Sequence, residues 1–202
     1  MRQKNTNGIL TVYAGPMYAG KTTALIAELE TSLEDGKSVF IVKPIIDNRY
    51  SSEDVVSHDG TSLKKETGHT VKCLGLSDIL QLSDLEDVDV LLVDEAQFFN
   101  ELSYKGIPEY LANGIDVVAV GLDMDSEGEG FGSMPFLLER ANVVYKLSSI
   151  CSVCGEEATR TFRKFTASST SQVLIGGNET YEPRCLEHWL KGQKEKYQFI
   201  KN

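Results

Sequence analysis

Long hydrophobic runs and cysteines are both scarce in this sequence, and each shortage excludes a class of protein. No apolar stretch approaches the roughly 20 residues that a membrane-spanning helix needs, so we expect no membrane partner. The first residues contain no apolar core of the kind found in secretion signals, and we expect a cytoplasmic protein. The cysteines number four, three of them near the C-terminus, which favours metal binding over a disulfide framework.

Basic residues are also outnumbered, with 20 lysines and arginines against 30 aspartates and glutamates, and the net charge is −10. A protein that binds along a nucleic-acid backbone needs clustered positive charge, so this balance argues against that function. Some lysines do gather near the C-terminus, but glutamate and glutamine alternate with them, and we therefore expect a solvated tail. These lysines are Lys191, Lys194, Lys196 and Lys201.

Hydrophobic residues make up 41% of the chain, which is enough to form a core. Short apolar runs alternate with helical patterns over most of its length, as in a parallel sheet that helices cover. The runs are nearly continuous, which is typical of strands buried on both faces. We therefore predict an α/β fold with helices on both faces of a parallel sheet. The expected strands are 9–14, 38–42, 70–74, 88–93, 115–120 and 142–147. The expected helices are one that ends at Gly36 and others near 77–85, 101–113 and 134–141.

The segment Gly15-Pro16-Met17-Tyr18-Ala19-Gly20-Lys21-Thr22 fits the pattern G-x-x-x-x-G-K-[ST] of a phosphate-binding loop. It follows a predicted strand and precedes a predicted helix, where backbone N–H groups and the helix N-terminus can bind phosphate. Lys21 would contact the β- and γ-phosphates of a nucleoside triphosphate, and the Thr22 hydroxyl would ligate Mg²⁺. A chance glycine-rich turn is the alternative, but this context favours a nucleotide site and a P-loop NTPase-like sheet.

The predicted strand at 88–93 leads directly into two carboxylates, Asp94 and Glu95. In a P-loop enzyme the first carboxylate at this position holds Mg²⁺, usually through water. Glu95 would act as a general base, a role typically worth ~10²–10⁴-fold in rate. The alternative is a surface cap on an apolar strand, which the upstream phosphate loop disfavours. The pair does not distinguish attack by water from attack by an alcohol, so hydrolase and kinase both stay open.

Two short motifs near the C-terminus predict a metal site. Cys151 and Cys154 form a C-x-x-C pair, and Cys185 and His188 form a C-x-x-H pair. Three thiolates and one imidazole suit a tetrahedral zinc ion without an open position, so the site would be structural rather than catalytic. The alternative is three incidental cysteines, which the two spacings disfavour. Cys73 lies in an apolar predicted strand and is interpreted as a buried thiol.

The chain between the two metal motifs, 155–184, is interpreted as a lid, because a zinc ion would clamp the base of this long loop. The strand–helix alternation ends near Ser148, which we take as a domain boundary. We predict a nucleotide-binding α/β domain at 1–148 and a zinc-binding lasso domain with a C-terminal helix or tail at 149–202. In the first domain, the polar stretch between Asp47 and His69 lacks periodicity, as functional or mobile segments often do.

Several motifs, taken in order, resemble those of the thymidine kinase family of the cellular, zinc-containing type, and the resemblance covers nearly the whole chain. The phosphate loop alone would be unspecific, but the ordered set is highly specific. The motifs are Gly15-Pro16-Met17-Tyr18, Asp47-Asn48-Arg49-Tyr50, His58-Asp59, Asp94-Glu95-Ala96-Gln97-Phe98-Phe99, Gly121-Leu122-Asp123, Phe131-Gly132, Ile175-Gly176-Gly177, Tyr181, Cys185 and His188.

The resemblance implies a role for each matching residue. Glu95 would accept the proton of the deoxyribose 5′-hydroxyl, with Arg49 and Lys21 as its catalytic partners. Magnesium would be held by Thr22, Asp94 and Asp47. ATP and its phosphates would be bound by Gly15, Pro16, Met17, Tyr18, Ala19, Gly20, Lys21, Thr22, Thr23, Asp94 and Gln97. The thymidine site would comprise Met17, Phe98, Leu122, Phe131, Thr161, Val173, Leu174, Ile175, Gly176, Gly177 and Tyr181.

The resemblance also implies the reaction, which is transfer of the γ-phosphoryl of ATP to the thymidine 5′-hydroxyl, with deoxyuridine as a second substrate. This is nucleotide salvage for DNA synthesis. It further implies a cytoplasmic homotetramer that thymidine triphosphate inhibits, with structural Zn²⁺ and with Mg²⁺ bound alongside ATP. The competing interpretation is a P-loop ATPase acting on nucleic acid, which the acidic composition opposes. An inactive interaction module would not explain why Lys21, Thr22, Asp94 and Glu95 occur together.

The segment 126–130 departs from the family pattern. Ser126 stands where relatives have an aromatic residue, Glu127 where they have a basic one, and Gly130 where they have proline. The loss of an aromatic wall typically removes ~1–3 kcal/mol of apolar contact, and added glycine increases backbone freedom. The sequence therefore predicts a looser nucleoside pocket with the phosphoryl-transfer residues unchanged. Leu186, between the last two metal ligands, also replaces a basic residue.

Overall fold

The central element of the fold is a six-stranded sheet in which every pair of neighbours is parallel. The computed structural model describes residues 7–44, 55–56, 62–63, 70–74, 80–100, 105–164 and 179–200. The strands follow the order β5 (Thr70–Leu74), β2 (Val39–Pro44), β6 (Val90–Val93), β7 (Asp116–Gly121), β1 (Leu10–Ala14) and β8 (Val143–Lys146). In the register, Ala14 lies opposite Gly121 and Val93 opposite Ala119. The carboxyl ends of β1, β6 and β7 therefore meet at one edge of the sheet.

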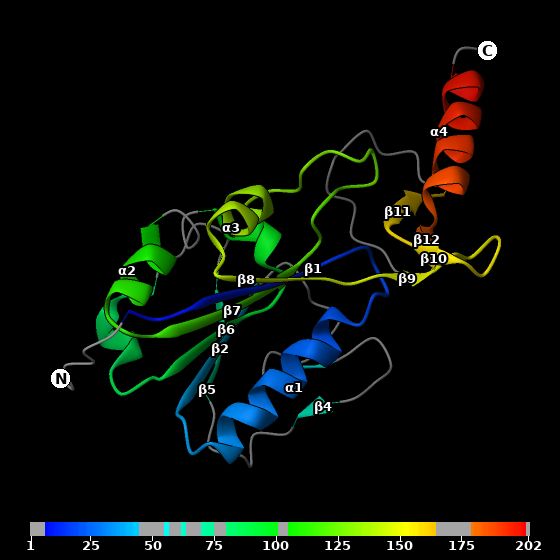
Figure 1. The fold of residues 1–202 in the computed structure, drawn as a ribbon. Helices are drawn as coiled ribbons and strands as arrows, with labels where there is room; N and C mark the ends of the chain where they lie inside the picture. Colours follow the sequence, from blue (N-terminus) through cyan, green and yellow to red (C-terminus); the bar gives the residue numbers. More distant parts are fainter. Residues whose placement is uncertain are drawn as a thin grey trace.

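Helices cover both faces of this sheet, as Figure 1 shows. Helix α1 (Lys21–Glu34) packs on one face, and α2 (Ile107–Ala112) and α3 (Met134–Arg140) pack on the other. The inner strands are buried on both sides: in β2, Val39 and Ile41 face α1, while Phe40 and Val42 face the opposite cluster. The edge strand β8 is exposed. The arrangement confirms the predicted α/β class and explains why the strands show no polar alternation.

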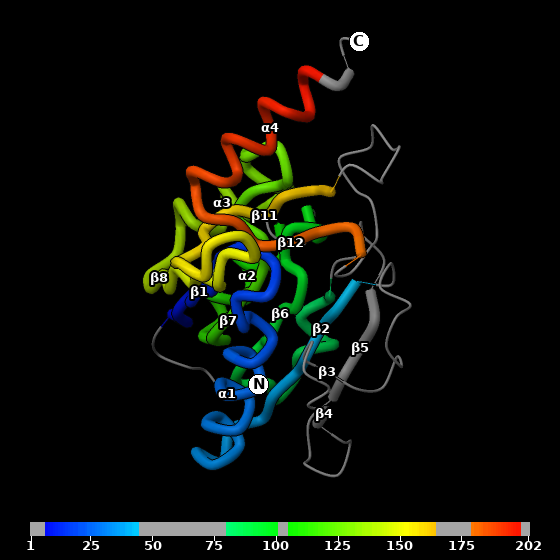
Figure 2. The backbone as a smooth tube through the Cα atoms, turned by 90° about the vertical axis from the view of Figure 1, so that its right-hand side faces the viewer, coloured from blue at the N-terminus to red at the C-terminus, as the bar shows by residue number. Residues whose placement is uncertain are grey.

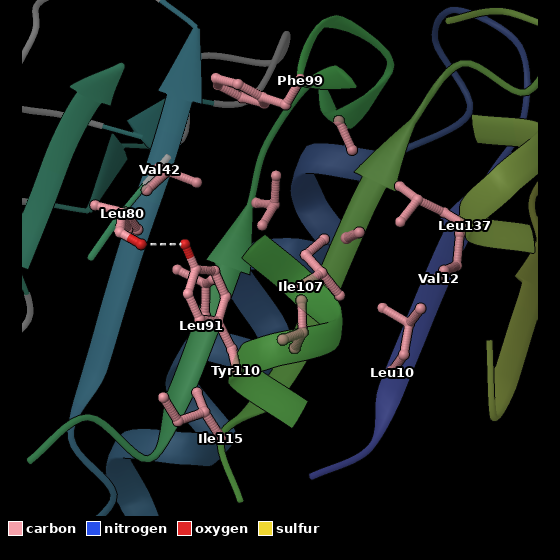
Figure 3. Packing of buried hydrophobic residues seen from close by; sticks show 14 of the residues in the cluster. Leu10, Val12, Val42, Leu80, Leu91, Phe99, Ile107, Tyr110, Ile115 and Leu137 are labelled. Carbon is pink, nitrogen blue, oxygen red and sulfur yellow. Dashed lines mark hydrogen bonds between the residues drawn. The ribbon is translucent and has the colours of Figure 1, made fainter. Parts of the chain in front are cut away.

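The core on the α2 and α3 side surrounds the aromatic ring of Tyr110 (Figure 3). The Tyr110 hydroxyl donates a hydrogen bond to the carbonyl of Leu80 at 2.5 Å, so the buried phenol is satisfied. Burial of each large apolar side chain contributes about 1.5–3 kcal/mol, and this layer contains many of them. Those labelled in Figure 3 are Leu10, Val12, Val42, Leu80, Leu91, Phe99, Ile107, Tyr110, Ile115 and Leu137.

The predicted strands and the predicted helices that end at Gly36 and span 134–141 are confirmed within a few residues, and parts of the other two predicted helices lie outside the described residues. Of the helix expected near 77–85, the described part is the 3-10 helix η2 (Leu82–Leu85). Of the one expected at 101–113, the described α-helix begins at Ile107 with a proline in its first turn. Proline suits a helix start, because its missing N–H has no helical partner there. Two short strands, β3 (Val55–Val56) and β4 (Ser62–Leu63), form an antiparallel pair.

The C-terminal part consists of short antiparallel pairs and one long helix (Figures 1 and 2). Strand β9 (Ser149–Ile150) pairs with β10 (Glu157–Ala158), and β11 (Arg160–Arg163) pairs with β12 (Tyr181–Arg184). Helix α4 (Leu186–Ile200) follows. Among the described residues, no helix is both long and apolar enough to cross a membrane.

The solvated tail expected around the C-terminal lysines is wrong for Lys191, Lys194 and Lys196, which belong to α4, and Lys201 lies outside the described residues. Lys191 and Lys194 are indeed exposed, but Gln193 between them is buried against the rest of the protein. A helix can pack through one face even where its sequence is a mixed run of charges, and composition alone does not reveal that face.

Candidate functional site

The predicted phosphate loop connects β1 to α1 at the carboxyl edge of the sheet. Gly15 must be glycine, because a Cβ atom there would lie 2.3 Å from the carbonyl oxygen of Leu147. Gly20 and Tyr18 have left-handed backbones, with φ of 77° and 63°. The Lys21 ammonium donates a hydrogen bond to the Pro16 carbonyl at 2.6 Å, so the lysine folds back across its own loop. This close, curved backbone is the geometry that presents N–H groups to an anion.

The first turn of α1 continues the same site. Gly20 is the residue before the helix and contributes no side-chain cap, and the first turn contains no acidic residue. Lys21, Thr22 and Thr23 therefore begin a helix whose leading N–H groups and partial positive charge are available to phosphate. Thr22 is half-buried beside the loop, where its hydroxyl could reach a metal ion bound to the phosphates.

Carboxylates surround Lys21. Burial lowers the pKa of the Lys21 ammonium from its ordinary value, and the negative charges of Glu95, Asp123 and Asp94 act in the opposite direction. Lys21 therefore lies near the carboxylates that follow β6. The sequence predicted that these residues belong to a single site. The Lys21 ammonium and a divalent metal ion held by nearby carboxylates could both offset negative charge on a bound triphosphate.

Glu95 is held in an uncommon conformation. Its φ of 50° lies in the left-handed region, which costs a residue with a Cβ on the order of 1 kcal/mol. Its backbone N–H bonds to the Asp94 carboxylate at 3.0 Å. Its own carboxylate accepts a hydrogen bond from the Gln97 amide nitrogen at 2.5 Å. A strained residue with a fixed carboxylate points to function rather than to stability.

Gln97 positions that carboxylate. The Gln97 side chain is buried, and its amide oxygen accepts a hydrogen bond from the Leu122 N–H at 3.1 Å. Because a backbone N–H can only donate, the amide oxygen must face Leu122 and the amide nitrogen must face Glu95. Gln97 therefore links the end of β6 to the end of β7. The resemblance placed Gln97 among the ATP-binding residues, and its described contacts are with Glu95 and Leu122.

Four predicted nucleoside-site residues form two contacting pairs. The rings of Phe98 and Phe131 contact edge to face, with centroids 5.6 Å apart. The Thr161 hydroxyl accepts a hydrogen bond from the Met17 N–H at 3.0 Å, which joins β11 to the phosphate loop. Tyr181 is buried in β12. Other predicted residues lie outside the described part of the chain: Asp47, Arg49, Val173, Leu174, Ile175, Gly176 and Gly177.

Asp123 is a site residue that the sequence reasoning did not assign a role. It is buried, and its carboxylate forms an ion pair with Lys146 at 2.9 Å. It also lies close enough to Lys21 to influence that ammonium. The available signal was its position, since an acidic residue two places beyond the end of a parallel strand faces the ligand-binding edge.

The four predicted metal ligands come together in space. The ligand atoms of Cys151, Cys154, Cys185 and His188 all lie within 4.8 Å of one another. Two of the separations are 3.9 Å, from the Cys154 sulfur to that of Cys185 and from the Cys151 sulfur to the His188 Nδ1. Ligand atoms around a tetrahedral zinc ion lie about 3.5–3.8 Å apart, so this cluster could hold such a metal.

Local structure explains the cluster. The first pair lies in a tight turn, in which the Gly155 N–H bonds to the Cys151 carbonyl at 2.9 Å. The second pair spans the end of β12 and the first turn of α4. A metal ion would therefore tie the β9–β10 turn to the base of α4. The side chain of Cys73, together with His58 and His69, lies outside the described residues.

A parallel sheet with a phosphate loop after its first strand and carboxylates after a neighbouring strand defines a P-loop nucleotide-binding protein. The particular family follows from comparison with known sequences. The thymidine kinase family model matches residues 8–189, and the chain belongs to this family of nucleoside phosphotransferases.

Two curated relatives agree. A thymidine kinase of Thermococcus kodakarensis is 37% identical over 194 residues, covering 94% of this chain and 98% of the relative. A thymidine kinase of Onion yellows phytoplasma is 41% identical over 195 residues, covering 93% of this chain and 90% of the relative.

Proposed function

We propose that this enzyme transfers the γ-phosphoryl group of ATP to the 5′-hydroxyl of thymidine, with deoxyuridine as a second substrate. The observation that carries the proposal is the position of Glu95. Its carboxylate is anchored by Gln97 and acts on the charge of Lys21, so a base and a phosphate-binding cation share one site. A hydrolase would need to orient only water, whereas the adjoining Phe98 and Phe131 rings suit an organic acceptor.

In the proposed reaction the 5′-oxygen attacks the γ-phosphorus, the bond to the β–γ bridging oxygen breaks, and ADP leaves. Glu95 accepts the hydroxyl proton. Lys21 and Arg49 neutralise charge on the transferring group. Thr22, Asp94 and Asp47 would hold Mg²⁺, which would supply positive charge to stabilise the negative charge of the phosphates.

The nucleoside base would lie between the phosphate loop and β11. Met17 and Thr161 are already joined by a hydrogen bond, and Phe131 packs on Phe98. Leu122 begins the neighbouring loop, and Tyr181 would cover the base. Backbone of 173–177 would complete the site as a lid. A kinase benefits from such closure because water otherwise competes for the phosphoryl group.

We infer that the metal is Zn²⁺ and that its role is structural. Three cysteines and one histidine fit the donor set, and four protein ligands leave no position for substrate. We also infer two domains, 1–148 for nucleotide binding and 149–202 for the zinc-bearing lasso and C-terminal helix. A cytoplasmic homotetramer under feedback by thymidine triphosphate is proposed on the family resemblance, with nucleotide salvage for DNA synthesis as its role.

One assay tests the proposal against an ATPase that acts on nucleic acid. The protein is incubated with ATP and Mg²⁺ together with thymidine, deoxyuridine, uridine or single-stranded DNA. We expect ADP and a nucleoside 5′-monophosphate to appear in equal amounts with thymidine. Release of ADP that only DNA stimulates, without a phosphorylated nucleoside, would overturn the proposed function.

A further inference from the structure

The loop from Leu122 to Phe131, called here the β7–α3 loop, has both ends beside the proposed base. At its start, the Leu122 N–H bonds to Gln97, which holds Glu95. At its end, the Phe131 ring packs against Phe98. A displacement of this loop would therefore reach the proposed nucleoside site from two directions.

The tip of the β7–α3 loop is internally braced. The Asp125 carboxylate accepts hydrogen bonds from the Glu127 and Glu129 N–H groups at 2.9 and 3.0 Å. The Asp125 N–H bonds to the Glu129 carbonyl at 2.9 Å, and Met124 forms a bridge with Gly130. A side chain that bonds its own backbone in this way turns the loop into a compact unit. A displacement of the loop tip would therefore also move the two ends of the loop.

Helix α4 binds that tip. The Ser126 carbonyl accepts a hydrogen bond from the Gln193 amide nitrogen at 2.6 Å, and the Trp189 indole N–H lies 3.2 Å from the same oxygen. Ser126 and Gln193 are both buried, so water does not replace these bonds. Lys196, one turn further along α4, pairs with Glu127 at 2.5 Å.

The residues of the loop tip also fit against the helix. The Glu127 carboxylate pairs with Lys196, and Ser126 contributes its backbone carbonyl. Gly128 has a left-handed backbone, with φ of 85°, and a Cβ there would lie 3.0 Å from the Trp189 ring. The small residues of this loop thus make room for the helix.

Trp189 also connects the loop to the phosphate site and to the metal cluster. Its indole N–H lies 3.2 Å from the Thr161 carbonyl, and the Thr161 hydroxyl accepts the Met17 N–H of the phosphate loop. Trp189 directly follows His188, one of the four metal ligands. A metal ion bound to this cluster would fix the start of α4, and one turn later the helix contacts the loop.

We propose that Gln193, Trp189 and Lys196 of α4 are positioning residues that set the affinity for the nucleoside through the β7–α3 loop without touching substrate. The inference rests on the proposed thymidine kinase function. Because Gln193 and Lys196 contact the loop but not the phosphate loop, their effect should fall on the KM for thymidine and leave kcat and the KM for ATP unchanged.

The first test is Gln193→Met, which keeps the length of the side chain and removes the donor to Ser126. The loss of one buried hydrogen bond should raise the KM for thymidine about three- to tenfold. Amide exchange in 122–131 should become faster, while the zinc content stays the same. The matched control is Lys194→Met, an adjacent exposed position on the same helix, which should behave like wild type.

A second pair of variants does not disturb a buried group. Lys196→Glu places two negative charges together at Glu127 and should raise the KM for thymidine about twofold or more. The double variant Lys196→Glu with Glu127→Lys restores opposite charges and should return the KM to the wild-type value. Thermal stability and the KM for ATP should stay at the wild-type values in both variants, whereas a merely structural role for the pair would change the stability of Lys196→Glu without a selective change in the KM for thymidine.

The outcomes separate the two proposals. If wild-type protein phosphorylates no nucleoside, the proposed function fails. If wild type is active but neither Gln193→Met nor Lys196→Glu changes the KM for thymidine, the positioning role of α4 is overturned. An equal change in the KM values for thymidine and ATP would also overturn the positioning role of α4, because the effect would then not be transmitted through the β7–α3 loop.

Discussion

The carboxyl edge of the sheet and the metal-bearing C-terminal part are built on different principles. The first is made of strands of four to six residues whose inner members lie between two buried apolar clusters, so its geometry follows from core packing. The second consists of strands of two to four residues, a ligand cluster and side-chain bonds to backbone carbonyls. The sheet is thus held by burial, whereas the C-terminal part depends on a few discrete contacts.

That contrast suits the proposed reaction. Phosphoryl transfer needs Lys21 and Glu95 at fixed positions, which a sheet edge provides. Substrate exchange needs a cover that can open at modest cost, and a segment fixed at a small number of points can do so. The two halves meet at Thr161 and Met17, and at Ser149, whose hydroxyl donates to the Tyr18 carbonyl at 3.0 Å. These contacts align the cover with the phosphate loop.

Loss of the metal should have the largest effect of the changes considered, and the effect should fall on the C-terminal part rather than on the sheet. Cys185→Ser should unfold the C-terminal part and abolish activity, because structural zinc typically contributes on the order of 10 kcal/mol to a small domain. The sheet should persist, so far-ultraviolet circular dichroism should fall only in part. Cys73→Ser is the control and should retain full zinc content on elemental analysis. Equal metal content in Cys185→Ser and wild type would contradict the assignment.

Glu95→Gln tests the chemistry at the carboxyl edge of the sheet. We expect kcat to fall at least ~10²-fold, because the amide accepts no proton, while ATP still binds. The measurement is steady-state kinetics with thymidine together with ATP titration by calorimetry. The glutamine side chain has the same shape as glutamate and keeps folding intact, and Glu139→Gln at an exposed position of α3 is the matched control. A variant that retains more than about a tenth of wild-type kcat would exclude Glu95 as the base.

Gly15→Ala probes the packing of the phosphate loop against the sheet. The new methyl group would lie 2.3 Å from the Leu147 carbonyl, so backbone must shift. We expect a loss of about 1–3 kcal/mol in unfolding free energy and a weaker affinity for ATP. Thermal unfolding and ATP titration measure the two effects. Gly36→Asn is the comparison, since that position is open and asparagine tolerates its φ of 71°.

Tyr110→Phe is the mildest change and concerns the core alone. It removes the hydrogen bond to Leu80 and should cost about 0.5–1.5 kcal/mol of unfolding free energy with no change in KM. Burial raises the pKa of Tyr110 above its ordinary value, with the charge of Glu109 acting in the same direction. The unfolded chain therefore ionises first, and wild-type stability should decline above a pH of about 10. Tyr110→Phe should show a smaller decline.

The sequence predicted the sheet, the phosphate loop and the carboxylates after β6, because each of these features is formed by residues that are adjacent in the chain. Val90–Val93 is fully apolar and is followed directly by Asp94 and Glu95, so strand and site are adjacent in the chain. The spacing of Cys151, Cys154, Cys185 and His188 likewise encodes its own ligand set. Local patterns of this kind need no knowledge of the fold.

What the sequence did not predict depends on contacts between distant segments. The bond from Gln97 to Glu95 is local, but its orientation requires Leu122, 25 positions away. The ion pair of Asp123 and Lys146 forms only once β7 and β8 lie on either side of β1. The packed face of α4 is not evident from the sequence, because it includes Trp189 and Gln193 among charged residues and its partner is a backbone carbonyl.

Trp189 is also the one tryptophan of the chain. Its indole lies between the β7–α3 loop and β11, and the residue directly follows a metal ligand. All tryptophan fluorescence of this protein therefore comes from this position. Intrinsic fluorescence therefore needs no attached dye to follow metal uptake or nucleoside binding, and stopped-flow mixing could time each of them separately.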